Sequence, residues 1–192
     1  MTEPKPDFPS LSNQLLVSMP LLDDHNFAKT VILICQHNEE GAMGIVVNRV
    51  VNQSLGEIFL QLSMPVTSLS HMNTPVYDGG PVQQEVGFVI HNGNECDWDS
   101  SISINESLCL TTSRDILLAM ANGTGPEKAA LSLGYAGWGP GQLEEEIKSN
   151  AWFSIPTDSD IIFLGSVENK WRDAAKLLGF DYLKLSTQVG HA

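Results

Sequence analysis

The feature that most constrains this chain is a glycine-rich stretch around a tryptophan at residues 134–141, GYAGWGPG. Glycine adopts positive φ and lets a second backbone approach closely. The apolar residues 128–135 predict a buried strand before it, and residues 142–147 predict a helix after it. Residues 151–155 then alternate in polarity, which is typical of a strand. The stretch is therefore expected to be a turn between a strand and a helix.

Local residue types give that turn a more detailed interpretation. Pro140 fits the first turn of the helix, Gly139 its N-cap, and Asn150 a left-handed stop. A glycine turn that opens a helix can also bind an anion through free N–H groups. However, no lysine follows the turn, the P-loop and dinucleotide motifs are absent, and the helix carries three glutamates. We therefore favour a structural turn, with a ligand cradle as the alternative.

Length and composition predict one domain with one core. The chain has 192 residues, of which 42% are hydrophobic, enough for one substantial core. We expect residues 1–10, which are rich in proline, to be flexible, and residues 11–192 to form a single domain. The first ten residues lack the apolar segment of a secretion signal, and no run of about 18 apolar residues predicts a membrane span.

The charge balance argues against anionic macromolecules as partners. The chain has 10 basic and 23 acidic residues, a net charge of −13. Proteins that bind nucleic acid directly need several Lys or Arg contacts to phosphates, and no basic stripe is present. Direct binding to nucleic acid or to an anionic membrane is therefore disfavoured.

Cysteine and histidine patterns predict neither a disulfide framework nor a metal centre. The three cysteines, Cys35, Cys96 and Cys109, lack C-x-x-C spacing and favour reduced thiols in a cytoplasmic protein. The histidines lack tight ligand spacing, so we predict no metal site, and no motif indicates a cofactor.

The order of the expected elements gives the fold class. Strands are expected at 14–19, 30–36, 43–48, 74–77 and 86–91, with one or two more within 102–110. Ser54 and Glu57 form a capping box before a helix, and further helices are expected after Ser113 and over 168–178. Residues 160–164 fit a buried strand or a short helix. Hairpins predominate without regular βαβ alternation, which predicts an α+β fold with a mixed, mainly antiparallel sheet.

Few residues are candidates for chemistry. Arg49 is an isolated cation in an acidic half; it could hold an anionic ligand, but we favour an ion pair with Asp78 or a glutamate of residues 144–146. Trp138 could be an exposed ligand platform or a core residue, and the sequence does not separate the two. The candidate residues for binding a ligand or partner are Asn48, Arg49, Asp78, Gly79, Gly80, Gly137, Trp138, Gly139 and Gly141.

Four sequence blocks together resemble the AlgH/YqgE family of bacterial proteins. They are residues 15–20 with 27–35, 41–49, 77–82, and 134–146 with 150–152. The resemblance implies one α+β domain with a small closed or bifurcated β-barrel core surrounded by helices. It implies no settled biochemical activity, although one branch is named for a regulatory link to alginate production. The family usually has proline after Asn48-Arg49; here Val50 replaces it, and we expect a looser turn.

The leading functional hypothesis is a cytoplasmic, non-enzymatic binding or regulatory module that acts through protein or small-ligand contacts. The first alternative is a hydrolase-like enzyme with a cleft near Arg49, Asp78 and His91, which requires these groups to converge. The second alternative, a transcriptional regulator that binds DNA, is disfavoured by the net charge of −13.

Overall fold

A computed structural model describes residues 9–93 and 97–179. The strands are β1 (Gln14–Ser18), β2 (Val31–Asn38), β3 (Gly41–Val46), β4 (Val50–Ser54), β5 (Pro75–Asp78), β6 (Val82–Asn92), β7 (Ser101–Asn105), β8 (Leu108–Thr111), β9 (Ala129–Trp138) and β10 (Trp152–Pro156). The helices are α1 (Leu55–Gln61), α2 (Arg114–Asn122), α3 (Gln142–Lys148), α4 (Ser159–Phe163) and α5 (Val167–Leu177). Most of residues 1–10, the chain after Gly179, and Cys96 lie outside the described residues.

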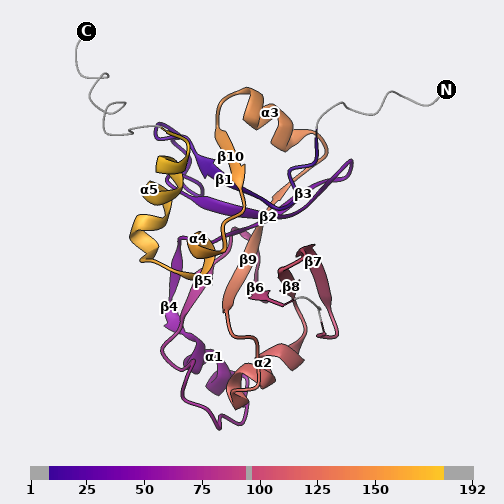
Figure 1. Ribbon diagram of the computed structural model, residues 1–192, viewed down its shortest axis with the longest axis vertical. Coiled ribbons are helices and arrows are strands. Elements are labelled where there is room, and N and C mark those ends of the chain that lie inside the picture. Colours follow the sequence, from indigo (N-terminus) through magenta and orange to yellow (C-terminus); the bar gives the residue numbers. More distant parts are fainter. Residues whose placement is uncertain (1–8, 94–96, 180–192) are drawn as a thin grey trace, which may run out of the picture.

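The strands form a curled, half-barrel sheet (Figure 1). Its order is β10-β1-β2-β3-β9-β6-β8-β7, and β5 joins β4 to β9. All pairs are antiparallel except β5 with β9, which is parallel. The predicted α+β class with a mixed, mainly antiparallel sheet is confirmed.

Side chains along a strand point alternately to the two faces of a sheet, and this explains why helices cover both faces of the part formed by β10, β1, β2 and β3. Leu15 and Val17 of β1 face α4 and α5 and pack with Trp171, whereas Leu16 faces the opposite side and packs with Leu143 of α3. Strands buried on both faces read as continuous apolar runs, as β2 does. A separate cluster seats α1 and α2 against β5 and β9 at the other end of the molecule (Figure 1).

Several local predictions are confirmed. Ser54 and Glu57 make the capping box of α1, and Asn150 is left-handed with φ of 57°. Helix α5 buries Trp171 together with two alanines on one face, and residues 160–163 belong to the short helix α4 rather than to a strand. No helix in residues 9–93 and 97–179 is long and apolar enough to cross a membrane.

The central glycine stretch differs from the prediction of a turn. Strand β9 does not end near Tyr135 but continues to Trp138, with one bend at Gly134, where φ is 74°. The strand continues because it gains a second partner beyond the bend: residues 129–133 and Tyr135 pair with β6, and residues 136–138 pair with β3. Helix α3 then begins only at Gln142 with Gly141 as N-cap, so the predictions for Gly139 and Pro140 are wrong.

The bend in β9 exists because another backbone crosses it. Gly79 donates its N–H to the Leu133 carbonyl at 2.8 Å and accepts from the Val46 N–H at 3.0 Å. A Cβ on Gly80 would lie 2.3 Å from the Tyr135 carbonyl carbon, and a Cβ on Gly134 would lie 2.4 Å from the Gly80 carbonyl oxygen. Three glycines are therefore needed for direct backbone contact, which we call the glycine crossing: Gly79, Gly80 and Gly134.

The prediction of three reduced thiols holds for one described cysteine and is wrong for the other. Cys35 is a free thiol whose pKa is raised to about 12 by burial, so it is inert as a nucleophile at neutral pH. Cys109 is buried and disulfide-bonded. Burial in an apolar strand thus decides the chemistry of Cys35.

The glycine crossing generates a matched test, because Gly134 and Gly141 have φ of 74° and 73° but different surroundings. No atom lies within 4 Å of a Cβ at Gly141. We expect Gly141→Ala to cost about 1 kcal/mol from backbone strain alone. Gly134→Ala adds a backbone clash and is expected to cost more than about 3 kcal/mol. Urea unfolding measures both, and equal losses would contradict the steric account.

Candidate functional site

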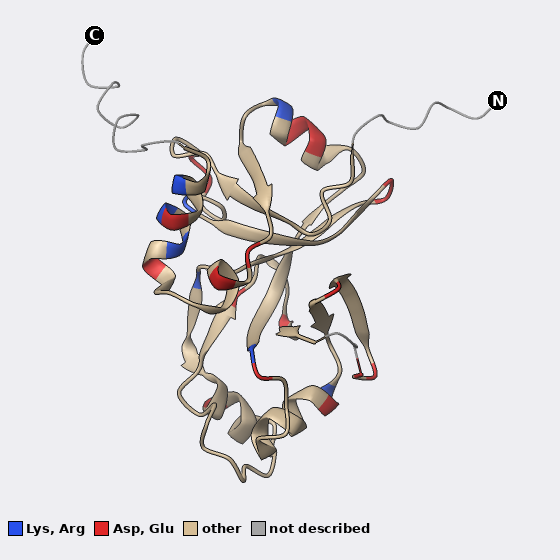
Figure 2. Ribbon diagram, viewed as in Figure 1, with Lys and Arg blue, Asp and Glu red and all other residues tan. Residues whose placement is uncertain are grey.

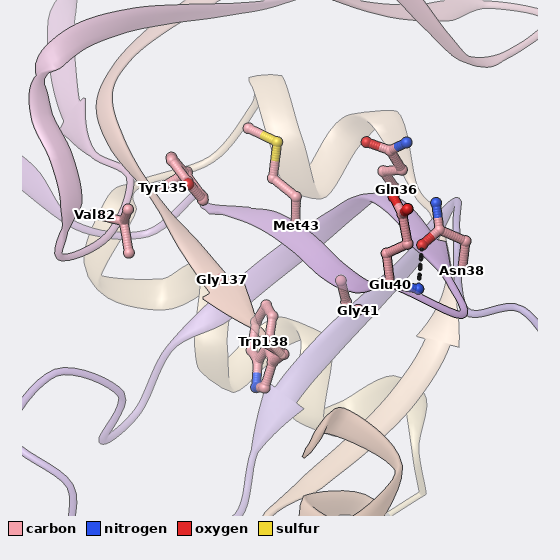
Figure 3. A pocket seen from close by; sticks show the side chains of 10 residues that line it. Gln36, Asn38, Glu40, Gly41, Met43, Val82, Tyr135, Gly137 and Trp138 are labelled. Carbon is pink, nitrogen blue, oxygen red and sulfur yellow. Dashed lines mark hydrogen bonds between the residues drawn. The ribbon is translucent and has the colours of Figure 1, made fainter. Parts of the chain in front are cut away.

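A groove of about 420 Å³ lies on the sheet where β2, β3 and β9 meet the start of β6 (Figure 3). Its apolar floor consists of Met43, Val82 and Tyr135, all half-buried, and its rim consists of Gln36, Asn38 and Glu40, all exposed. The floor is open because Gly137 has no side chain; a Cβ there would lie 3.2 Å from the Tyr135 ring.

Two contacts fix the shape of the groove. The Tyr135 ring is held edge-on by Phe88, with ring centroids 5.6 Å apart. The Asn38 side-chain oxygen accepts from the Glu40 backbone N–H at 2.8 Å and orders the turn between β2 and β3 (Figure 3). Apolar floor, polar rim and one rim carboxylate suit non-covalent recognition.

Trp138 closes one end of the groove but is mainly a core residue, with an exposed fraction of 6%. Its ring packs in a cluster with Phe27 and Trp152, with centroids 6.3 Å and 6.2 Å away. The indole N–H groups of Trp138 and Trp152 both donate to one oxygen of Glu146, each at 2.8 Å. The two interpretations of Trp138 therefore resolve in favour of the core.

A second carboxylate attaches α3 to the sheet. The Nδ1 atom of His37 accepts from the Leu11 N–H at 2.9 Å, so the ring proton lies on Nε2 and donates to Glu144 at 3.1 Å. With Glu146 bound to the indoles, α3 contacts β2, β9 and β10 through its glutamates. These side chains have a structural role, which the sequence did not indicate.

Asn48 and Arg49 make hydrogen bonds to backbone groups near the start of β2. The Asn48 side chain accepts from the Val31 N–H and donates to the Lys29 carbonyl, both at 2.8 Å. The Arg49 guanidinium donates to the carbonyls of Asn26 at 2.6 Å and Ala28 at 3.0 Å. In the described ranges Arg49 makes no ion pair, so the favoured pairing with Asp78 or a helix glutamate is wrong. Its position faces the carbonyls of the loop before β2 instead.

The set suggested for a hydrolase is not brought together. Asp78 lies beside Arg49 through a backbone hydrogen bond of 3.0 Å, but His91 lies elsewhere. Asp78 pairs with Leu133 of β9, and His91 pairs with Ala129 from the other side of that strand. Four residues of strand span about 13 Å, beyond hydrogen-bond reach.

His91 is also poorly placed to act as a base on a ligand. It is buried, with Nε2 2.8 Å from the Thr111 hydroxyl and Nδ1 3.2 Å from the Asn92 carbonyl. Desolvation lowers the pKa of His91, which keeps the ring neutral. Across the described parts of the chain, no three His, Cys, Asp or Glu side chains gather to hold a metal ion.

Of the nine predicted site residues, two line the groove and the others are elsewhere. Gly137 and Trp138 are in its wall, whereas Gly79 and Gly80 form the glycine crossing and Gly141 caps α3. Gly139 donates its N–H to the Gln142 side chain at 3.0 Å. The sequence reasoning missed the floor and rim. The predicted hairpin of β2 and β3 could have indicated part of the groove, since its register places Gln36 of the rim opposite Met43 of the floor.

The shared carboxylate on the two indoles gives a prediction. Glu146→Ala removes the acceptor of two buried N–H groups, and we expect a loss of about 2–4 kcal/mol in the free energy of unfolding. Glu145→Ala is the matched control, because Glu145 is exposed and pairs only with Lys148 in the same helix. The control is expected to change stability by less than about 0.5 kcal/mol. Chemical unfolding compares them; similar values would show that the indoles do not depend on Glu146.

Comparisons with known proteins give one consistent family. Residues 15–183 match a family model described as AlgH-like. A protein of Hahella chejuensis named UPF0301 protein is 49% identical over 183 residues, covering 95% of this chain and 97% of that protein. A UPF0301 protein of Xanthomonas campestris is 46% identical over 182 residues, covering 95% and 96%.

Two solved structures are similar over most of the chain. The solution structure of the AlgH protein of Pseudomonas aeruginosa matches with a TM-score of 0.77 and 42% identity, covering 100% of both chains. A crystal structure of a Corynebacterium diphtheriae protein matches with a TM-score of 0.70 and 21% identity, covering 88% of this chain and 86% of that one, and shows the shared fold alone. The protein described here belongs to the AlgH-like, UPF0301 family.

Proposed function

We propose that this protein is a non-enzymatic binding module with a regulatory role, and that it acts by holding a segment of a partner protein in the groove beside Trp138. The observation that carries the proposal is the groove itself: a half-buried apolar floor of Met43, Val82 and Tyr135 lies open beside exposed polar side chains. Such a floor gains free energy when an apolar side chain covers it.

The charge of the groove selects the partner. Glu40 is the one acidic or basic residue among those that line the groove, and Glu39 is exposed in the same turn. Figure 2 shows this turn as acidic, and the whole chain has a net charge of −13. A partner segment with a basic residue beside an apolar one is complementary to both features. The same charge disfavours nucleic acid as the partner.

An enzymatic role has less support than binding. The groove lining contains no histidine, cysteine or pair of carboxylates that could share acid–base work.

A displayed library of random peptides tests the proposal with a defined probe. We expect selected peptides to carry Lys or Arg next to an apolar residue, and to bind through the groove. Glu40→Lys is expected to weaken them about tenfold or more, since it replaces attraction by repulsion at the rim. Gly137→Val fills the open floor and is expected to weaken them similarly.

Glu39→Lys is the matched control, with the same change in net charge at the neighbouring residue outside the groove lining. It is expected to weaken binding only slightly, through the long-range field, and this small effect should vanish at high salt. Two outcomes would contradict the groove as the recognition site. In one, the peptides bind Glu40→Lys and Gly137→Val as tightly as the unaltered protein; in the other, the library yields no binder.

A further inference from the structure

A second pocket, of about 370 Å³, lies where β5 and β9 meet the start of α5. Its apolar walls include Tyr77, Ala130 and Phe163, and its polar groups come from Thr74, Ser166 and Glu168. It shares no lining residue with the groove beside Trp138. Pockets of this size hold small molecules with an apolar body.

Beside this pocket, Lys170 of α5 is buried without a counter-charge. Its exposed fraction is 2%, and its amine donates to the Ile162 carbonyl at 2.5 Å and to the Tyr77 hydroxyl at 3.2 Å. The amine also lies 4.9 Å from the centre of the Tyr77 ring. No carboxylate lies within ion-pair distance of it in the described parts of the chain. Isolated buried ammonium groups are costly, and a nearby anion offsets that cost.

Tyr77 connects the amine to the pocket. Tyr77 is one of the residues that line the pocket, and its exposed fraction is 8%. The hydroxyl oxygen accepts from Lys170, but the hydroxyl proton has no acceptor among residues 9–93 and 97–179. A hydroxyl that accepts from an ammonium group is a stronger donor, because hydrogen bonds in a chain polarise one another.

The start of α5 supplies further donors. Ser166 is the N-cap of this eleven-residue helix, its hydroxyl makes no capping bond, and residues 166–168 line the pocket. The first N–H groups of a helix lack partners within the helix and favour negative charge. Ser166 and Lys170 are four residues apart and lie on one face of α5.

We propose that this pocket is a binding site for a small organic carboxylate, whose apolar body packs between Ala130 and Phe163 and whose carboxylate accepts from the hydroxyl of Tyr77. The Lys170 ammonium, behind Tyr77, supplies the positive charge, and the first turn of α5 supplies N–H donors. Glu168, which is exposed at the rim, opposes the anion through solvent. Binding in this pocket does not require the groove beside Trp138, which has no lining residue in common with it.

Benzoate is the probe, and benzamide is its uncharged control of the same shape. We expect benzoate to shift the backbone amide NMR signals of Ala129, Ala130 and Val167 in a saturable way at millimolar concentration, and to bind more tightly than benzamide. Tyr77→Phe keeps the ring but removes the donor, and is expected to weaken benzoate about tenfold or more. Glu168→Gln is expected to have the opposite effect and to tighten binding.

The dependence on pH gives a second measurement that needs no variant of uncertain stability. Desolvation lowers the pKa of Lys170 to about 8, so the ammonium is lost as pH rises through that value. Benzoate binding is expected to weaken across this range, and benzamide binding is not. Tyr77, which also lines the pocket, does not change charge there, since burial raises its pKa above the usual value near 10.

The following results would contradict carboxylate binding in this pocket. Absence of saturable shifts shows that the pocket takes no carboxylate. Shifts that persist unchanged in Tyr77→Phe, or equal binding of benzoate and benzamide at every pH, show that Tyr77 and Lys170 do not recognise the charge. The groove variant Gly137→Val is expected to leave benzoate binding unchanged, which separates this inference from the proposed function.

Discussion

The direct contact between two backbones at the glycine crossing is the constraint on which the fold depends. Gly79 and Gly80 pass so close to Gly134 that no side chain fits between them. The contact bends β9, and the bend lets a single strand complete two differently oriented parts of the sheet. Without it, residues 136–138 could not reach β3, and both the groove floor and the seat of α3 would be lost.

The bend in β9 also determines where the groove lies, because the part of the strand after the bend carries Trp138, which closes one end of the groove. The strand delivers this ring into the cluster with Phe27 and Trp152, and Glu146 ties both indoles to α3. Buried polar groups of this kind are tolerated because each donor has an acceptor. One consequence is that the Trp138 wall of the groove is supported from behind by the rings of Phe27 and Trp152 and by the carboxylate of Glu146.

Local patterns in the sequence were sufficient wherever neighbours in the chain decide the structure. The capping box of Ser54, the buried face of α5 around Trp171 and the apolar run of β2 were all predictable for this reason. The partners of Arg49 and the extension of β9 were not, because they depend on segments distant in sequence. Glycine in particular is ambiguous: Gly134 and Gly141 share one φ, but the first serves a crossing and the second a helix start. Of the groove floor, only the position of Met43 was predictable from the sequence, because the β2–β3 hairpin places it opposite Gln36.

The pairing of β1 with β10 has a consequence for how the chain is made. Gln14 lies opposite Pro156, so the second edge of β1 is covered only after β10, one of the last elements, has been made. On a ribosome, β1, β2 and β3 emerge long before β9 and β10, and their apolar edges remain open during synthesis. The amino-terminal strands of the nascent chain therefore keep unpaired edges until most of the chain has been made.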